Sequence, residues 1–385
     1  MKPILRFTDF TDDYIESKLK NYVDVYDGTH ETPNYVDNGI KFISVENIKD
    51  LLKSDKYIPE NDYNKYKIKP KYNDVFMTRI GDIGTPAIYK SNAPLAYYVS
   101  LALLRSKNES LLYPDYLNQY ISNQRFQKEL HDRTIHVAFP KKINTGEIGE
   151  CNINIPSYNE QVKVSNFLSL LDKKIELQSK KIEDLKLFKL YITNQLLSSN
   201  IIDTVSVSSL GEIVTGTTPS KDKNEYWENG NILWITPSDI TEERDINNSN
   251  FKLTEAGLKK GRFIPKDSIL ITCIASIGKN AVIKSNGSCN QQINAIIPNS
   301  NYNSNYIYYL INNISKYMQS IAGTSATSII NKEQFSNILV SVHQKDYQDK
   351  IDLILSSFEK KIELELSKLD KIQNIKKGLM QSMFV

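Results

Sequence analysis

The sequence predicts an α+β fold in which two mixed α/β globules are joined by two long helices that form an antiparallel coiled coil. Apolar residues recur at alternating steps of three and four over residues 168–196 and 355–383, which is the pattern of a coiled-coil seam. The second stretch repeats the first 187 residues later (355 − 168), together with the same two polar interruptions. We therefore expect an internal pseudo-two-fold repeat.

The repeated heptads assign each position of the seam. The predicted seam residues are Leu168, Leu171, Ile175, Ile182, Leu185, Ile192 and Leu196 in the first stretch and Leu355, Phe358, Ile362, Leu369, Ile372, Leu379 and Met383 in the second. Gln178 and Lys189 interrupt the first stretch, as Glu365 and Lys376 interrupt the second. Charged residues flank this narrow seam, which favours a coiled coil over an amphipathic helix buried in the core of one domain.

An antiparallel pairing favours a register that opposes apolar seam residues to one another. The polar pairs that result are Lys189 with Glu365 and Gln178 with Lys376. In the alternative, the lysines extend their charges off the seam and Phe188 and Ile375 fill it. The seam is roughly 42 Å long at ~1.5 Å per residue, and we expect the globules at opposite ends of this rod.

Local patterns divide the chain into four segments. These are residues 1–155 (first globule), 156–200 (first long helix), 201–342 (second globule) and 343–385 (second long helix). A length of 385 residues fits two or three domains. Ser157 followed by Glu160 predicts a capping box at the start of the first long helix.

The two globules share turns, strands and a helix. The segment Gly28 to Pro33 corresponds to Gly216-Thr217-Thr218-Pro219, and the strand-like run 42–45 corresponds to Trp234-Ile235-Thr236. Residues 74–88 and 267–283 each combine a strand with a glycine turn, and one helix is predicted over 116–130 and again over 305–321. The segments between these shared anchors differ most, so each globule is expected to recognise something different.

Composition excludes some classes of protein. The net charge of +3 is a weak argument for a nucleic-acid partner, although a local basic face remains compatible with it. Cys151, Cys273 and Cys289 have no metal-ligand spacing, and an odd number of cysteines fits a reducing cytoplasm. The first residues lack the apolar run of a signal peptide, and no apolar run is long enough to span a membrane.

Several short sequence motifs, together with the two related heptad stretches, resemble one family over the whole chain: the DNA specificity subunits of type I restriction–modification enzymes. These motifs are Leu5-Arg6-Phe7-Thr8-Asp9-Phe10, Gly216-Thr217-Thr218-Pro219-Ser220, Trp234-Ile235-Thr236, Gly323-Thr324-Ser325-Ala326-Thr327 and the run from Lys376 to Phe384. The first globule departs more from the family pattern, because His30-Glu31-Thr32 interrupts its Gly-Thr-Pro turn and Arg79-Ile80-Gly81 replaces the usual strand end.

The resemblance implies that each globule is a target-recognition domain that reads one half of a bipartite, asymmetric target in double-stranded DNA. It further implies that the coils dock two methyltransferase subunits, which would methylate adenine N6, and that restriction/translocase subunits join the complex. S-adenosylmethionine, Mg and ATP are expected on those partner subunits, with no cofactor, metal or catalysis on this chain. The predicted rod suits half-sites centred about one helical turn apart or slightly more.

The residues themselves give no catalytic motif. Ile277-Gly278-Lys279-Asn280 lacks the first glycine and the hydroxyl of a phosphate-binding loop. The Asn-Pro-Pro-Tyr/Phe run typical of amino-methyltransferases is missing, and the four histidines (His30, His131, His136 and His343) are scattered along the chain.

Reading DNA requires side chains that reach base edges and cations that contact phosphates. The candidates in the first globule are Asn34, Lys41, Arg79, Thr85, Arg133 and Lys141, and those in the second are Thr217, Ser220, Lys221, Ser276, Lys279, Asn280, Gln291, Gln292, Ser325 and Thr327. Arg79 and Lys279 are favoured because they lie in or beside the repeated glycine turn. The alternative is that many of these residues only shape turns or cap strands.

Two other classes of function remain open. A coiled-coil scaffold with two protein-binding globules would show no salt-dependent affinity for DNA. A restriction–modification fusion with a divergent catalytic site would transfer methyl groups without a partner. Purification from the native host would separate these hypotheses, because only the specificity subunit is expected to co-purify with a methyltransferase.

Overall fold

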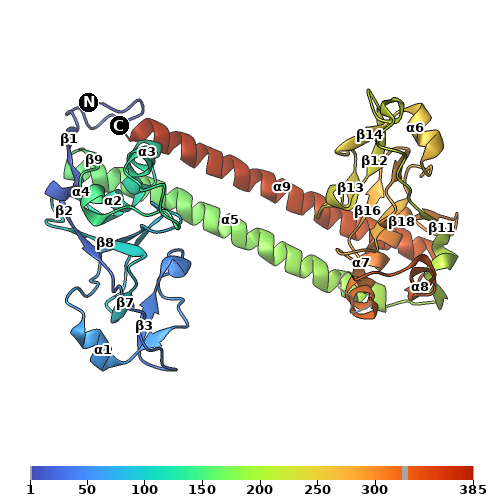
Figure 1. Ribbon diagram of the computed structural model, residues 1–385, viewed down its shortest axis with the longest axis horizontal. Coiled ribbons are helices and arrows are strands. Elements are labelled where there is room, and N and C mark those ends of the chain that lie inside the picture. Colours follow the sequence, from blue (N-terminus) through green and yellow to red (C-terminus); the bar gives the residue numbers. More distant parts are fainter. Residues whose placement is uncertain (1, 323–327, 385) are drawn as a thin grey trace. The chain divides into compact units, whose positions relative to one another are not determined.

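The computed structural model describes residues 2–322 and 328–384, and the chain divides into two units. The first unit comprises residues 1–179 and 367–385, and the second comprises residues 180–366. Two long helices, α5 (Tyr158–Ser198) and α9 (Lys345–Met383), each contribute one part to each unit (Figure 1). These are the two long helices that the heptads predicted.

The first unit contains three small sheets. One has the strand order β2 (Val23–Asp27), β8 (Leu101–Ser106), β5 (Val75–Thr78), β6 (Pro86–Ile88), and a second has β4 (Tyr57–Ile58), β3 (Ile40–Ile43), β7 (Leu95–Tyr97). In the third, β1 (Ile15–Lys18) pairs with β9 (Asn152–Ile155). Strands β3 and β7 are parallel, whereas the other pairs are antiparallel.

The second unit repeats this plan. Its sheets have the orders β11 (Gly211–Thr215), β18 (Ile293–Pro298), β15 (Ile269–Thr272), β16 (Asn280–Ile283), β13 (Asp245–Ile246); β14 (Phe251–Leu253), β12 (Ile232–Ile235), β17 (Gly287–Cys289); and β10 (Asp203–Ser206), β19 (Leu339–Val342). The parallel pair β12–β17 corresponds to β3–β7. A capping box follows the first strand of each pair, with Ser44 and Asn47 in one unit and Thr236 and Asp239 in the other.

The helices of the two units differ at one place. The first unit has α1 (Glu60–Lys65), α2 (Pro114–Ile121), α3 (Gln124–Asp132) and α4 (Thr145–Gly149), and the second has α6 (Glu255–Lys260), α7 (Ser304–Ile321) and α8 (Lys332–Ser336). The single helix predicted over 116–130 is therefore wrong, whereas its counterpart α7 is continuous. Asn123 causes the break, because its side chain accepts hydrogen bonds from the N–H groups of Arg125 and Phe126 and caps a new helix.

A buried glutamine near the start of each long helix fixes the preceding loop in the same way. Gln161 donates to the carbonyls of Leu111 and Pro156 and accepts from the N–H of Tyr113. The corresponding bonds of Gln348 are with Asn301, His343 and Asn303. Both glutamines are at most 2% exposed. Each long helix is thereby joined to its own globule by side-chain to backbone bonds, which hydropathy patterns do not reveal.

The predicted capping box at the start of α5 is wrong, because the Glu160 carboxylate is used elsewhere. Glu160 is completely buried and binds Arg6 through both of its oxygens, at 2.8 and 2.7 Å. The hydroxyl of Tyr14 donates a third hydrogen bond to it at 3.0 Å. A buried carboxylate needs this many partners to offset the loss of its hydration.

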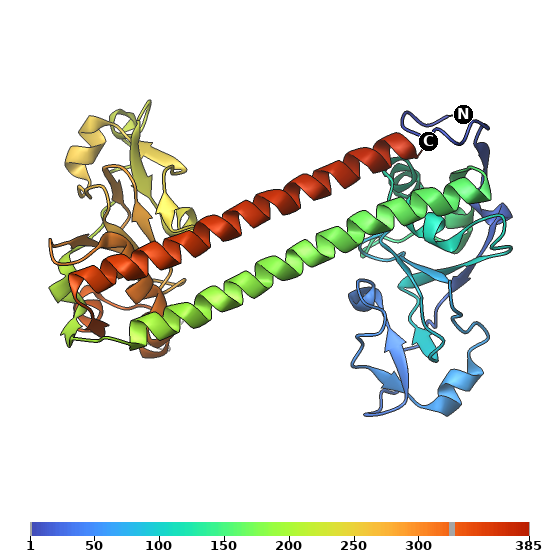
Figure 2. The same ribbon diagram turned by 180° about the vertical axis from the view of Figure 1, so that it is seen from behind.

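All fourteen predicted seam positions are buried or partly buried in the structure. Helix α9 lies beside α5 in both views (Figure 1; Figure 2). In the first unit, Leu168 packs in one cluster with Leu379 and Met383, and in the second unit Leu355 packs with Ile192. The seam therefore joins the helices within each unit.

The predicted register of the seam is wrong by about one heptad. Lys189 binds Glu359, with 2.7 Å between Nζ and Oε1, and Glu365 binds Lys181 at 3.0 Å. Glu359 and Glu365 are six residues apart, roughly 9 Å along a helix, which is more than one turn. A slip of one heptad places polar seam residues opposite apolar ones, for example Lys189 opposite Phe358, and the lysines bind acids beside the seam instead. Matching polar to polar positions therefore did not give the register.

The alternative arrangement, in which the lysines leave the seam and Phe188 and Ile375 fill it, is only partly present. Lys189 reaches the flank of the seam, as the alternative required, and the ring of Phe188 contacts Phe358 edge-on at 5.5 Å. However, Phe188 is 50% exposed and Ile375 is 56% exposed, so neither fills the seam.

In the observed register, equivalent lysine–carboxylate ion pairs form at repeat-related positions in the two units. Lys189 binds Glu359 in the second unit, and Lys376 binds Asp172 in the first. Each residue of one pair lies 187 positions from its counterpart in the other (376 − 189 and 359 − 172). The lysines occupy seam positions and the acids lie beside the seam, where the four side chains remain 18–44% exposed and keep part of their hydration.

A double-mutant cycle will test this register. We expect Lys189→Met and Glu359→Leu to show a coupling of about 0.5–1 kcal/mol, because the ion pair is partly solvated. Lys189→Met and Glu365→Leu should be additive to within about 0.5 kcal/mol, because those residues lie more than a turn apart. The measurement is the free energy of unfolding of the full chain in urea. Coupling to Glu365 without coupling to Glu359 would restore the original register.

Candidate nucleic-acid interface

The glycine turn of the second unit connects β15 to β16. The N–H of Gly278 donates to the carbonyl of Thr272 at 3.0 Å, and Gly278 has φ +86, where a side chain would be strained and would meet Ser315. Lys279 is exposed beside it and Ser276 is half-buried. Asn280 is 4% exposed and donates to Asn312 at 2.9 Å, so its position argues against the predicted DNA contact.

The corresponding turn of the first unit connects β5 to β6. The N–H of Gly84 donates to the carbonyl of Thr78 at 2.9 Å, which matches the bond of Gly278. Thr85 is half-buried at this turn, and its hydroxyl donates to Asp82. The two turns are therefore equivalent in backbone bonding and differ in the side chains that they present.

Arg79, a favoured DNA candidate, lies inside the first unit. It is 6% exposed, forms an ion pair with Asp27 and donates to the carbonyl of Ile143 at 3.0 Å. This position argues against a DNA contact, because a guanidinium held by a carboxylate in the interior cannot reach a phosphate. Its sequence position beside a glycine turn did not indicate this, since the Asp27 partner comes from a distant strand.

A loop that lies later in the chain binds the glycine turn in both units, and we call it the closing loop. It comprises residues 133–143 in the first unit and includes residues 328–330 in the second. In the first unit, the N–H of Ile143 donates to the carbonyl of Arg79 at 3.0 Å and the N–H of Gly81 to that of Lys141 at 2.8 Å. In the second, Ile330 donates to Cys273 at 2.9 Å. Lys141 is exposed, whereas Arg133 is half-buried and binds Glu129 and Glu147. Ser325 and Thr327 lie outside the described residues.

A second group of candidates lines an open cavity of about 520 Å³ in the second unit. Its lining includes Lys221, Gln291 and Gln292, together with Thr218, Thr236, Pro237, Ser238, Asn290 and the rings of Trp234 and Phe251. Lys221 lies over the Phe251 ring at 5.9 Å, and the Thr218 hydroxyl donates to Gln291 at 2.5 Å. An aromatic floor with exposed amide and cationic groups suits contacts to bases and phosphates.

The Gly-Thr turn beside this cavity depends on a residue without a side chain. A Cβ at Gly216 would lie 2.2 Å from the carbonyl oxygen of Asn290. Thr217 is half-buried, and its carbonyl accepts from the Trp234 indole at 3.1 Å. Ser220 is exposed, and its carbonyl accepts from Trp227 at 2.9 Å. Thr217 and Ser220 thus have backbone roles in shaping the cavity, in line with the turn interpretation.

The remaining candidates in the first unit are separate from the glycine turn. Asn34 is exposed in the loop before β3. Lys41 on β3 donates to the carbonyl of Ser54 at 3.1 Å and lies 5.4 Å from the Tyr57 ring centre. Lys41 is therefore held within its own sheet, and this argues against a phosphate contact.

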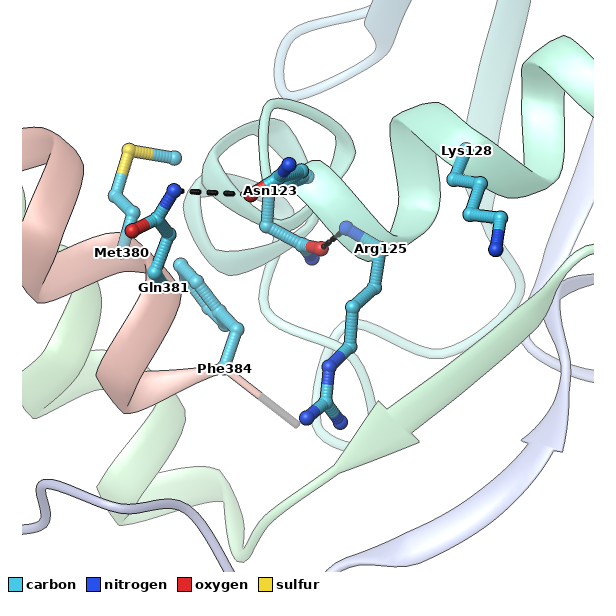
Figure 3. A pocket seen from close by; sticks show the side chains of 7 residues that line it. Asn123, Arg125, Lys128, Met380, Gln381 and Phe384 are labelled. Carbon is cyan, nitrogen blue, oxygen red and sulfur yellow. Dashed lines mark hydrogen bonds between the residues drawn. The ribbon is translucent and has the colours of Figure 1, made fainter.

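The structure adds a basic surface that the sequence did not predict. Helix α3 and the end of α9 enclose a cavity of about 520 Å³ in the first unit. Figure 3 shows Arg125 and Lys128 on α3, with Gln381 on α9 and Phe384 directly after the end of α9. Two cations three residues apart on one helix were the available signal. The signal was incomplete, because the cavity also requires the end of α9, which lies far away in the sequence.

Three thiols and one histidine lie in the interior, where burial shifts their pKa values. Burial raises the pKa of Cys273 to about 11 and the pKa values of Cys151 and Cys289 to about 12, so the thiols stay protonated near neutral pH. Burial also lowers the pKa of His343, whose Nδ1 is 2.6 Å from the Tyr306 hydroxyl. Across residues 2–322 and 328–384, no group of His, Cys, Asp and Glu side chains is arranged to hold a metal ion.

Comparison with known families decides what this repeated architecture is. The sequence model described as "Type I restriction modification DNA specificity domain" matches residues 16–187 and again residues 202–374, once for each repeat. The chain belongs to this family. The predicted resemblance to type I specificity subunits is thereby confirmed.

Relatives within the family match part of the chain. The type I restriction enzyme MjaIX specificity subunit of Methanocaldococcus jannaschii is 31% identical over 189 residues, which cover 48% of this chain and 44% of that protein. The EcoR124I/EcoR124II specificity subunit of Escherichia coli is 32% identical over 208 residues, 51% of each chain. The matched region thus spans about half the length of these relatives.

Solved structures show the same fold. The type I restriction–modification S subunit from M. genitalium has a TM-score of 0.62 at 14% identity and covers 100% of this chain and 99% of its own. A chain from a type I restriction–modification complex has a TM-score of 0.65 at 10% identity, with 97% and 98% coverage. In the described part of the chain, no helix is long and apolar enough to cross a membrane.

Proposed function

We propose that this specificity-domain protein reads a bipartite, asymmetric target in double-stranded DNA, one half with each globule. The observation that carries the proposal is the pairing of a glycine turn with a closing loop, which is built with the same backbone bonds in both units. The side chains that these loops present differ, with Thr85 and Lys141 in one unit and Ser276 and Lys279 in the other. Equivalent loops with different side chains suit the reading of two unlike half-sites.

We further propose that two methyltransferase subunits and restriction/translocase subunits assemble on this chain. Large apolar residues are exposed at repeat-related positions of the long helices: Leu177 and Ile375 in the first unit correspond to Leu364 and Phe188 in the second. Each is 50–59% exposed. One apolar position from each helix, present in both units, suits two copies of the same partner.

Catalysis is assigned to those partners. S-adenosylmethionine, Mg and ATP would bind there, and the methyl group would be transferred to adenine N6 by the methyltransferase subunits.

Purification of the full-length chain from its native host, followed by mapping of methylated adenines in the genome, tests the proposal. We expect a methyltransferase to co-purify and the methylated motif to have two short half-sites separated by an unread gap. Co-purification of other proteins without any salt-dependent DNA affinity would favour the scaffold. Methyl transfer by the isolated chain would favour the fused enzyme.

Lys279→Ala should weaken binding of the assembled complex to every DNA sequence. An exposed lysine at the glycine turn suits a phosphate contact, so the slope of log affinity against log salt should fall by about one. Lys266→Ala is the matched control, because Lys266 is also exposed but precedes β15 at its other end. An unchanged slope with one degenerate target position would show instead that Lys279 reads a base.

A further inference from the structure

The closing loop of the first unit carries two fully exposed apolar side chains at its tip, Val137 and Phe139. Val137 is 97% exposed and Phe139 is 103% exposed, more than any other large apolar residue that the structure describes. Side chains of this size are normally buried, and each leaves apolar surface in water. Their exposure at the tip of a loop indicates a surface that a partner covers.

The base of this loop is held firmly while its tip projects. The N–H of Ile135 donates to the carbonyl of Lys142 at 2.8 Å, and the carbonyl of Lys141 accepts from Gly81. Ile80 pairs with Lys142 in an isolated bridge. The tip is thus presented from the glycine turn, the same place at which the proposed DNA-reading residues Thr85 and Lys141 lie.

The charge around the tip identifies the partner. Lys141 and Lys142 are exposed and follow Phe139 closely in the chain. The segment from 133 to 142 contains no acidic residue, and Asp82 is the exposed acid of the adjoining glycine turn. Protein interfaces are depleted of charged residues at their apolar centre. An apolar tip among cations instead suits nucleic acid, where cations contact phosphates and an apolar side chain enters between bases.

We propose that Phe139 is an apolar wedge that inserts between adjacent base pairs of the half-site read by the first unit, while Lys141 and Lys142 contact the flanking phosphates. This inference rests on the proposed DNA-reading function. At the corresponding positions of the second repeat, the sequence is Gly323-Thr324-Ser325-Ala326-Thr327, without a large apolar residue. The unstacking of bases is therefore expected in one half-site only.

The test uses the native complex of the full-length chain and duplexes in which 2-aminopurine replaces single adenines across the mapped target. We expect its fluorescence to rise several-fold at one step of one half-site, because unstacking relieves quenching. Phe139→Ala should abolish this rise and weaken DNA binding about tenfold, with an unchanged salt slope. Lys141→Ala should lower the slope by about one.

Leu111→Ala is the matched control, since Leu111 is 56% exposed in the same unit but precedes α2. It should change neither fluorescence nor affinity. Because Phe139 is fully exposed, Phe139→Ala should also leave the unfolding midpoint and methyltransferase co-purification unchanged. Unchanged DNA binding and fluorescence in Phe139→Ala would overturn the wedge, as would loss of the methyltransferase with DNA affinity retained. A wild-type complex that does not bind DNA would overturn the proposed function itself.

Discussion

Replacing Arg6 by methionine should destabilise the first unit by about 3–5 kcal/mol, because the completely buried Glu160 carboxylate would lose the cation that binds both of its oxygens. Urea unfolding of the full chain gives this value. The double variant Arg6→Met with Glu160→Met should recover most of the loss, since it leaves no charge buried without a partner.

Lys163→Met provides the control for Arg6. Lys163 also binds an N-terminal acid, Asp9, but the two side chains are 42% and 65% exposed, so the cost should be less than about 1 kcal/mol. Equal losses of unfolding free energy for Arg6→Met and Lys163→Met would show that burial of the Arg6–Glu160 pair does not raise the cost of breaking it.

The adjacent Leu5 donates its N–H to the carbonyl of Ser382 at 2.9 Å, so the N-terminal segment contacts both long helices within the first unit.

Trp234→Ala should cost the second unit about 3–5 kcal/mol of unfolding free energy, as expected for removal of a large buried side chain. Trp234 is 3% exposed, packs edge-on against Trp227 at 4.9 Å and donates to the carbonyl of Thr217. The same change removes a wall of the cavity that holds Lys221 and Gln291. We therefore expect adenine methylation mapping to show degeneracy in one half-site and an intact sequence in the other.

Phe251→Ala is the control for Trp234, because Phe251 lines the same cavity but is 51% exposed. It should cost less than about 1.5 kcal/mol, since about half of its surface already contacts water. If Trp234→Ala degraded both half-sites equally, the cavity would not be specific to one of them.

The parts of the fold that were predicted are those with a periodic signal. Heptads located both long helices and their seam, and spacing matched the strand-like run 42–45 and the glycine-turn segment 74–88 to their counterparts in the second globule. The parts that failed depend on single contacts between distant residues. The register followed Asp172 and Glu359 beside the seam, and Asn123 divided a helix that hydropathy joined.

The candidate interface shows the same limit. Glycine turns marked the place where exposed Lys279 and Lys141 lie, because a backbone that requires glycine leaves a local trace in the sequence. Whether a cation points outward or inward leaves no such trace. Arg79 lies inward because Asp27, on another strand, binds it. Nothing in the sequence marks Val137 and Phe139 as exposed, because apolar residues are more often buried.

The repeated ion pair has a consequence for how such chains arise. Lys189 and Asp172 belong to the first long helix, and their copies Lys376 and Glu359 belong to the second, so each helix carries both the lysine and the acid that the other requires. A gene encoding only one half would yield a product whose helix pairs with that of an identical molecule, through the same contacts. Fusion of two such genes, followed by divergence of one globule, converts a symmetric ancestor into an asymmetric reader without any change at the seam. Recombination between related genes within either helix would preserve the ion pairs and exchange one globule intact.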